Sequence, residues 1–296
     1  MEKHLRQWGY DAFRWIENSN TDTQAFVAGK EKYLVVCFRG TSSGKDALVD
    51  VNFFKTEAAG GRGRVHRGFH QSLESVWDQV QAAVDALGAD KKIFVCGHSL
   101  GAALAQLAAH RFALSAYPVA GIYVFGSPRV GNHEFREAYN ALLEAKTFLH
   151  INHRDVVTQL PPQLFGFHYL GGPLRLFDER HVISSPQTLQ DHPIPELRYE
   201  DLDIQRQEEI QQKIEEVQTA IQASTRFLNT SPQQFSGASY GTEFKTGAVD
   251  DHGMDQYLFK FGCAIVDGEW QRLEGVYSGS FDPLVPIWSD PLVPDL

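Results

Sequence analysis

The sequence predicts an α/β protein whose mostly parallel central sheet has helices on both faces. Three observations support this fold class. Strand-like and helix-like segments alternate through about residue 152, which is typical of parallel strands joined by helices. The chain of 296 residues is long enough for one large domain. Its composition, with 43% hydrophobic and 22% charged residues, is sufficient for a sizeable core.

The individual strands and helices are assigned from the spacing of their apolar residues. Segments rich in β-branched, aromatic and other apolar residues predict strands at 23–29, 32–40, 93–96, 119–128 and 147–152. Helical spacing predicts helices at 69–87, ended by Gly88, at 134–145, and in the alanine-rich run that starts near residue 100. Two further short segments suggest a closing hairpin at 168–177.

The composition changes near residue 184. Residues 184–202 are rich in proline and charge, and residues 203–230 predict an amphipathic helix with an otherwise Gln/Glu-rich surface. This helix either lies across the domain or acts as a mobile cap or dimer contact. Its apolar stripe has a heptad-like spacing and consists of Ile210, Ile214, Val217, Ile221 and Leu228.

These boundaries predict a single domain over residues 1–296 with two additions. The first is a helical insertion at 184–245. The second is a proline-rich C-terminal strap at 266–296, in which the sequence DPLVP occurs twice. Its proline density excludes a helix and favours an extended chain.

Charge and cysteine content restrict the partners and the location. The formal net charge of −10 argues against binding to nucleic acid or to anionic lipid. Three cysteines without a CxxC pattern predict neither a disulfide framework nor a metal site. The N-terminus lacks the apolar core of a signal peptide, and no run approaches the ~18 apolar residues of a membrane span. As the sequence stands we expect a soluble, cytoplasmic protein, or a secreted one if a leader was removed or a leaderless route is used.

The stretch GHSLG, residues 97–101, fits the pattern G-x-S-x-G between a predicted strand and a predicted helix. In such a turn the serine backbone is strained, and a Cβ at Gly97 or Gly101 would strike a neighbouring element. The strain lifts Ser99 Oγ clear of the sheet, beside the helix N-terminus, which stabilises an oxyanion. His98 lies inside this turn and is expected to point away from Oγ. The pattern favours Ser99 as a nucleophile over a merely structural glycine-rich turn.

A nucleophilic serine needs a base that is oriented by a carboxylate, and in sheets of this kind the order is Ser…Asp…His. Asp155 follows the predicted strand at 147–152, at the carboxyl end where it would face Ser99. Its rivals, Asp178 and Asp201, follow weaker strand signals. His252 comes after Asp155, in a polar loop ahead of an aromatic segment, and is the best candidate base.

The other histidines considered are less suitable because of their positions. His66 and His70 are four residues apart, but no further ligand completes a metal site, so they are interpreted as structural. His110 lies within a predicted helix. His168 and His181 flank the predicted hairpin.

Six motifs occur in order along the chain: FRGTSS (38–43), VHRGF (65–69), GHSLGAALA (97–105), FGSPRVGN (125–132), NHRDVVTQLPP (152–162) and DHGMDQY (251–257). Together they resemble the class 3 lipases, the family of fungal triacylglycerol lipases, which are α/β-hydrolases. The resemblance covers about residues 20–180 and 245–265.

This resemblance implies roles for particular residues. Ser99 would be the nucleophile, Asp155 the orienting acid and His252 the base. The oxyanion hole would be formed by the backbone N–H groups of Leu100 and Thr41, with the Thr41 hydroxyl as a further donor. From the residues alone, Thr41 could instead be a turn residue that caps its strand.

The resemblance also implies a short lid helix at 44–54. Ala47, Leu48, Val51 and Phe54 would share one helical face, and Asp46 belongs to the same segment. A lid of this kind would open readily at a lipid interface because opening exposes apolar surface. A buried loop that does not move is the alternative.

The implied activity is hydrolysis of acylglycerol esters through an acyl-enzyme, without a metal and without a cofactor. The partner would be a lipid ester substrate at an oil–water or membrane interface. A phospholipase A1, a feruloyl or short-chain esterase, or an acyltransferase would use the same three residues. A catalytically silent scaffold that binds partners, or a second copy, through the 203–230 helix is the alternative from a different class.

Overall fold

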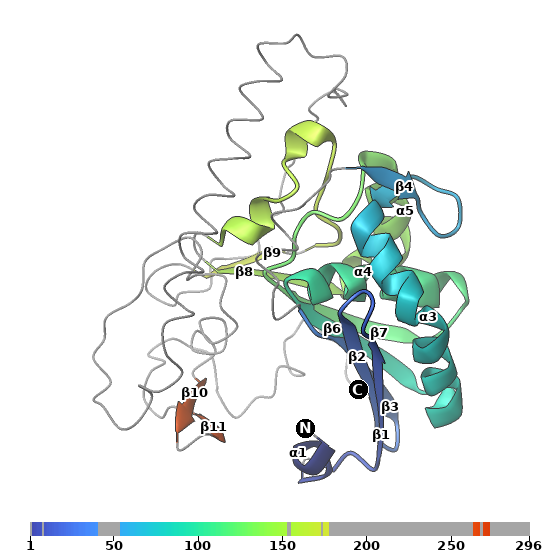
Figure 1. Ribbon diagram of the computed structural model, residues 1–296, viewed down its shortest axis with the longest axis vertical. Helices are drawn as coiled ribbons and strands as arrows, with labels where there is room; N and C mark the ends of the chain where they lie inside the picture. The colour runs from blue at the N-terminus through green and yellow to red at the C-terminus, as the bar shows by residue number, and fades with distance from the viewer. Residues whose placement is uncertain are drawn as a thin grey trace.

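The computed structural model describes residues 2–7, 9–40, 54–152, 155–172, 174–177, 263–266 and 269–272 (Figure 1). Its main feature is a seven-stranded sheet with the strand order β1-β2-β3-β6-β7-β8-β9. The strands are β1 (Ala12–Asn18), β2 (Thr23–Gly29), β3 (Tyr33–Phe38), β6 (Lys92–His98), β7 (Val119–Phe125), β8 (Thr147–Asn152) and β9 (Leu174–Phe177).

The sheet is mostly parallel, as predicted. β1 pairs with β2, and β2 with β3, in antiparallel register, whereas every pair from β3 to β9 is parallel. In the part of the chain that the structure describes, two small antiparallel pairs lie outside this sheet. They are β4 (Lys55–Glu57) with β5 (Arg64–His66), and β10 (Cys263–Val266) with β11 (Glu269–Arg272).

Within the described ranges, three long helices cover the sheet: α3 (Arg67–Gly88), α4 (Leu100–Leu114) and α5 (His133–Leu143) (Figure 1). α3 packs on β1, β2 and β3, and α4 packs on β3, β6 and β7. α4 also contacts both α3 and α5, so the three helices form one layer. A helical layer on the opposite face stays a prediction.

The periodicity of α3 explains why this segment is helical. Its buried side chains recur every three or four residues and form one apolar face. The helix begins at the N-cap residue His66, whose ring accepts a hydrogen bond from the backbone N–H of Phe69. It ends at Gly88, whose φ of 122° an L side chain rarely adopts. The buried residues are Phe69, Leu73, Val76, Val80, Ala83 and Val84.

α4 is buried nearly all round, because its small side chains allow close packing against the sheet and against both neighbouring helices. The side chain of His110, in this helix, is buried at 3% exposure, and its ring centre lies 5.0 Å from that of Phe135. Burial lowers the pKa of His110 from 6.5 to about 4. The folded protein therefore favours the neutral imidazole.

This lowered pKa predicts a pH-dependent loss of stability. The unfolded chain takes up the His110 proton first as the pH falls, so the neutral ring stabilises the fold above about pH 6.5 and this contribution is lost as the pH falls through about 4. Between about pH 7 and 4, the free energy of unfolding in urea should fall by up to about 3 kcal/mol more in the wild type than in His110→Leu. The exposed His133→Gln variant should retain the wild-type slope; equal slopes in all three proteins would contradict the prediction.

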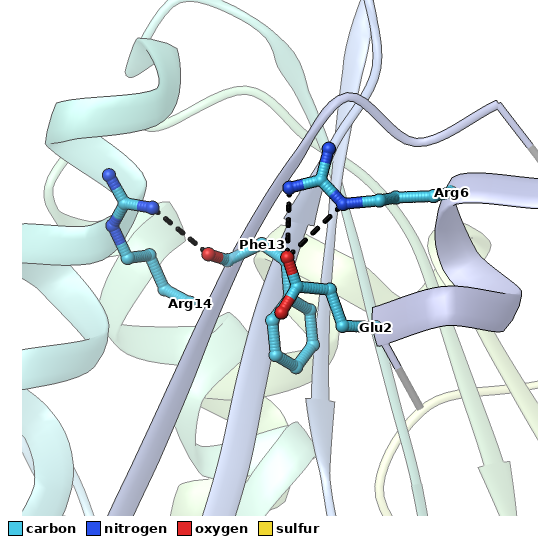
Figure 2. A network of polar contacts seen from close by, with 4 residues as sticks. All are labelled: Glu2, Arg6, Phe13 and Arg14. Atoms are coloured by element: carbon cyan, nitrogen blue, oxygen red, sulfur yellow. Dashed lines mark hydrogen bonds and ion pairs between the residues drawn. The ribbon is translucent and has the colours of Figure 1, made fainter.

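Several short elements were not predicted from the sequence. One is β1, the edge strand. Another is the N-terminal helix α1 (Glu2–Gln7), in which the Arg6 guanidinium donates to Glu2 Oε1 at 2.8 and 3.2 Å. Figure 2 shows this ion pair beside β1, where Arg14 donates to the carbonyl oxygen of Phe13. These groups are exposed, so each contact contributes little to stability.

The predicted closing hairpin at 168–177 is wrong. β9 pairs in parallel with β8, and His168 instead forms an isolated antiparallel bridge with Gly131. The predicted insertion at 184–245, including the helix at 203–230, lies outside the described residues. The same holds for the strap at 266–296, apart from Val266 and the strand β11.

Candidate active site

Ser99 occupies the turn between β6 and α4. Its backbone has φ 59° and ψ −128°, a conformation that is strained for any residue with a side chain. Two contacts fix it there. Its N–H donates to the carbonyl oxygen of Phe125 at 3.0 Å, and its own carbonyl oxygen accepts from Ala102 at 3.0 Å. The expected strain of this turn is therefore present, and the neighbouring strand β7 holds it in place.

The two glycines that flank Ser99 are required by close backbone contacts. A Cβ on Gly97 would lie 2.2 Å from the carbonyl oxygen of Gly101. A Cβ on Gly101 would lie 2.2 Å from the carbonyl oxygen of Phe38. Gly40, after β3, also approaches the turn, since its Cβ would lie 2.9 Å from the carbonyl oxygen of His98. The start of α4 thus packs closely against β6 and the end of β3. A side chain at any of these three glycine positions would prevent this close contact.

Replacing Gly101 by alanine should destabilise the protein, because the new methyl group meets backbone that cannot move aside. We expect the free energy of unfolding to fall by about 1–3 kcal/mol, as for other overpacked sites. Gly172→Ala is the matched control, since its Cβ would lie 3.5 Å from Glu144 Cγ, an ordinary contact. Urea denaturation of the two variants measures the difference. Equal stabilities would show that the turn is not tightly packed.

The start of α4 contributes hydrogen-bond donors beside Ser99. Leu100 is the first residue of the helix and is 8% exposed. The N–H groups of a first helical turn have no acceptor within the helix, and the positive end of the helix dipole lies there. A negative charge that forms next to Ser99 would be stabilised at this position.

Asp155 follows β8 and is buried, with 1% of its surface exposed. It is the N-cap of the short 3-10 helix η2 (Val156–Gln159), and its Oδ1 accepts a hydrogen bond from Val157 N–H at 2.9 Å. Its own N–H donates to the carbonyl oxygen of Asn152 at 2.8 Å. We call residues 155–161 the Asp155 loop.

Ser99 and Asp155 lie at the same edge of the sheet. They follow β6 and β8, which are parallel and are separated in the sheet by β7 alone. The carboxyl ends of such strands form the edge at which sheets of this kind bind ligands. The structure therefore places both residues, which the sequence assigned to a nucleophile and its orienting acid, at one edge of the sheet.

Most of the other residues that the sequence suggested for the site lie in segments that the structure does not describe. His252, Thr41, Asp46, Leu48 and Val51 lie outside the described residues. The rivals Asp178, Asp201 and His181 do so as well.

Phe54 is described and is 55% exposed. The Arg67 guanidinium lies over its ring at 4.9 Å, and its carbonyl oxygen accepts from the Arg67 N–H at 2.9 Å. Among the described residues, no group of three or more His, Cys, Asp or Glu side chains is placed to hold a metal ion.

Sequence reasoning gave no role to one feature of the site. The loop after β7 carries the motif FGSPRVGN, and its arginine, Arg129, contacts the Asp155 loop directly. The motif can be recognised in the sequence, but the contact of Arg129 cannot. The groups that accept its hydrogen bonds are backbone carbonyl oxygens, which every residue has.

A mostly parallel sheet in which a strained serine joins a central strand to a helix defines an α/β-hydrolase. Comparison with known proteins narrows this class. Residues 35–165 match the family described as Lipase (class 3). This segment of the chain is therefore similar to the class 3 lipase family.

Two curated relatives illustrate the similarity. Secreted mono- and diacylglycerol lipase 1 of Fusarium solani is 33% identical over 184 residues, which are 57% of this chain and 53% of that protein. The lipase of Rhizomucor miehei is 34% identical over 182 residues, which are 57% of this chain and 48% of that protein. The chain thus spans about half the length of the curated relatives it matches.

Two solved structures agree with this result. Rhizomucor miehei triacylglyceride lipase aligns with a TM-score of 0.52 at 27% identity, over 57% of this chain and 67% of that chain. A triacylglycerol lipase described as having a serine protease triad as its catalytic centre aligns with a TM-score of 0.51 at 27% identity. That alignment covers 64% of this chain and 78% of that chain.

Proposed function

We propose that this protein is a serine carboxylic-ester hydrolase that cleaves acylglycerol esters. Ser99 is the nucleophile, Asp155 the orienting acid and His252 the base. The observation that carries the proposal is the strained backbone of Ser99 at the start of α4, on the same sheet edge as the buried Asp155. The similarity to class 3 lipases and the names of the relatives support the reaction class.

In the proposed reaction Ser99 Oγ attacks the carbonyl carbon of the ester while His252 accepts its proton. The negative charge on the carbonyl oxygen is stabilised by the N–H of Leu100 and, in this proposal, by Thr41. The tetrahedral intermediate collapses, and the His252 imidazolium protonates the departing alcohol. Water, deprotonated by the same histidine, then attacks the acyl-enzyme, releases the fatty acid and restores Ser99.

Acylglycerols are proposed as substrates because the relatives are described as lipases of mono-, di- and triacylglycerols. A phospholipase A1 and a feruloyl or short-chain esterase would share these residues and differ in the acyl and alcohol pockets. Hydrolysis rates on triolein, phosphatidylcholine and a feruloyl ester, with Ser99→Ala as the blank, decide between them. We expect triolein to be the best substrate; a preference for either other ester would overturn the substrate class but not the chemistry.

The lid at 44–54, a lipid–water interface as the place of action, and an oligomer formed through 203–230 all stay predictions. None of the helices in the described ranges is long and apolar enough to cross a membrane. The predicted cytoplasmic location is untested, and the named relative from Fusarium solani is described as secreted.

A further inference from the structure

The Asp155 loop is contacted at its far end by one arginine. The backbone N–H of Arg129 donates to the carbonyl oxygen of Leu160 at 2.7 Å. Its guanidinium Nη1 donates to the carbonyl oxygens of Gln159 and Pro161, the second at 3.2 Å. A residue of the neighbouring loop thus binds three consecutive residues of the Asp155 loop.

Tyr169 connects the same arginine to the beginning of the loop. The Arg129 guanidinium lies over the Tyr169 ring at 4.7 Å, and the Tyr169 hydroxyl donates to the carbonyl oxygen of Thr158. The Thr158 hydroxyl in turn donates to the carbonyl oxygen of Asp155 at 2.7 Å. Tyr169 and Thr158 are 8% and 2% exposed, so water competes little for these bonds.

The near end of the Asp155 loop is held by a bond to the last residue of β8 and by bonds within the loop. Asp155 N–H donates to Asn152, Val157 N–H donates to Asp155 Oδ1, and Leu160 N–H donates to the Val157 carbonyl oxygen at 3.0 Å. These local bonds close the turn but do not attach its far end to the rest of the protein. Arg129 and Tyr169 supply that attachment.

We propose that Arg129 is a positioning residue for the Asp155 carboxylate. It acts through the loop backbone and through Tyr169, and it keeps the carboxylate in the orientation in which it can bind the base. This inference rests on the proposed function, because it concerns the acid of the same three residues. It also assigns a role to the motif FGSPRVGN, which contains none of the proposed catalytic residues.

The chemistry of the guanidinium explains why this position holds arginine. A planar guanidinium can donate to two carbonyl groups and stack on an aromatic ring at the same time. A lysine ammonium is a compact point charge on a flexible stem. Arg129→Lys should therefore retain one of the two side-chain hydrogen bonds, and Arg129→Met should retain neither.

The expected effect of Arg129→Met is a fall in kcat of ~10–100-fold with little change in KM, since small displacements of reacting groups cost up to about that much. Arg129→Lys should lie between this variant and the wild type. Tyr169→Phe removes the bond to Thr158 but keeps the ring, and should lower kcat in the same direction. Because both side chains act on one loop, the double variant should lose less than the product of the single effects.

The pH profile separates positioning from a general loss of structure. The base acts in its neutral form, and a nearby carboxylate favours the protonated imidazole, so correct placement of Asp155 raises the pKa of the base. Displacing the carboxylate lowers that pKa. In Arg129→Met the acid limb of the kcat/KM profile should therefore shift to lower pH, with a lower plateau.

Arg111→Met is the matched control. Arg111, in α4, also lies over an aromatic ring, with its guanidinium 5.0 Å from the centre of the Trp77 ring, and it pairs with Glu74. Its loss should lower thermal stability to a degree comparable with Arg129→Met. It should leave kcat and the midpoint of the acid limb unchanged, because it does not touch the Asp155 loop.

The experiment compares the wild type, Arg129→Met, Arg129→Lys and Arg111→Met on a p-nitrophenyl ester across the pH range, together with fluorophosphonate labelling. A lower kcat and a shifted acid limb in Arg129→Met alone, partly restored by lysine, support the proposal. A wild-type pH midpoint in Arg129→Met overturns it, whatever the loss of stability. Failure of the wild type itself to label would instead overturn the proposed function on which the inference rests.

Discussion

Ser99→Ala is expected to lower kcat on p-nitrophenyl esters by at least ~10⁴-fold, because the attacking oxygen is removed and only binding and oxyanion stabilisation remain. The fold should be unaffected. Ser99 is 5% exposed, and alanine differs from serine only by the hydroxyl group. Initial rates under saturating substrate, with thermal unfolding as a check on folding, measure the effect.

The control for this substitution lies at the other end of the same helix. Ser115 is the C-cap of α4 and is exposed. Ser115→Ala should therefore keep wild-type kcat. Hydrolysis by Ser99→Ala well above the uncatalysed rate would mean that a different residue attacks the ester.

Asp155→Asn should lower kcat by ~10⁴-fold, the effect seen when an amide replaces the carboxylate of such a triad. An amide can neither hold the histidine in the required tautomer nor stabilise its protonated form. The loop should still form, because the Oδ1 of asparagine can accept the hydrogen bond that Val157 N–H donates to Asp155. The loss should therefore appear in kcat and not in the free energy of unfolding.

Asp178→Asn and Asp201→Asn are the natural comparators, since these carboxylates were the rivals of Asp155 in the sequence. Both should retain wild-type kcat. A large loss in either, with Asp155→Asn near the wild type, would move the acid to another loop.

The parts of the fold that were predicted correctly have strong local signals. α3 was expected at 69–87 and extends from Arg67 to Gly88, because its apolar residues recur at helical spacing and Gly88 supplies the positive φ at its end. β6 and the turn at Ser99 could be predicted because Gly97 and Gly101 indicate a close approach of two backbone segments. The structure shows this close approach. Local sequence determines such features directly.

The parts that were missed depend on contacts distant in sequence. β1 lies at the sheet edge and buries only Ile16 well, so its alternation is weak. The prediction of a hairpin at 168–177 was wrong because a glycine turn does not determine which strand the next segment pairs with. Here β9 pairs in parallel with β8. Gly171, with φ 82°, instead allows the chain to pass Thr147, from which its Cβ would lie 2.4 Å away.

In the site, too, features with a local sequence signal were predicted, and contacts between distant loops were not. Ser99 and Asp155 each follow a parallel strand, and the strand order places both strand ends at one sheet edge. Their roles as nucleophile and acid stay proposals. The contacts of Arg129 were not foreseen, since they join two loops through carbonyl groups that carry no side-chain signal. His252 was chosen by its order along the chain and stays a proposal.

The most direct test is to identify, by peptide mass spectrometry, the residue that a fluorophosphonate modifies in the wild type and in His252→Ala. We expect one adduct on Ser99 in the wild type, and a rate of modification at least ~100-fold lower once the general base is removed. Modification of a residue other than Ser99, or none at all in folded wild-type protein, would contradict the account. An undiminished rate in His252→Ala would show that another group activates the serine.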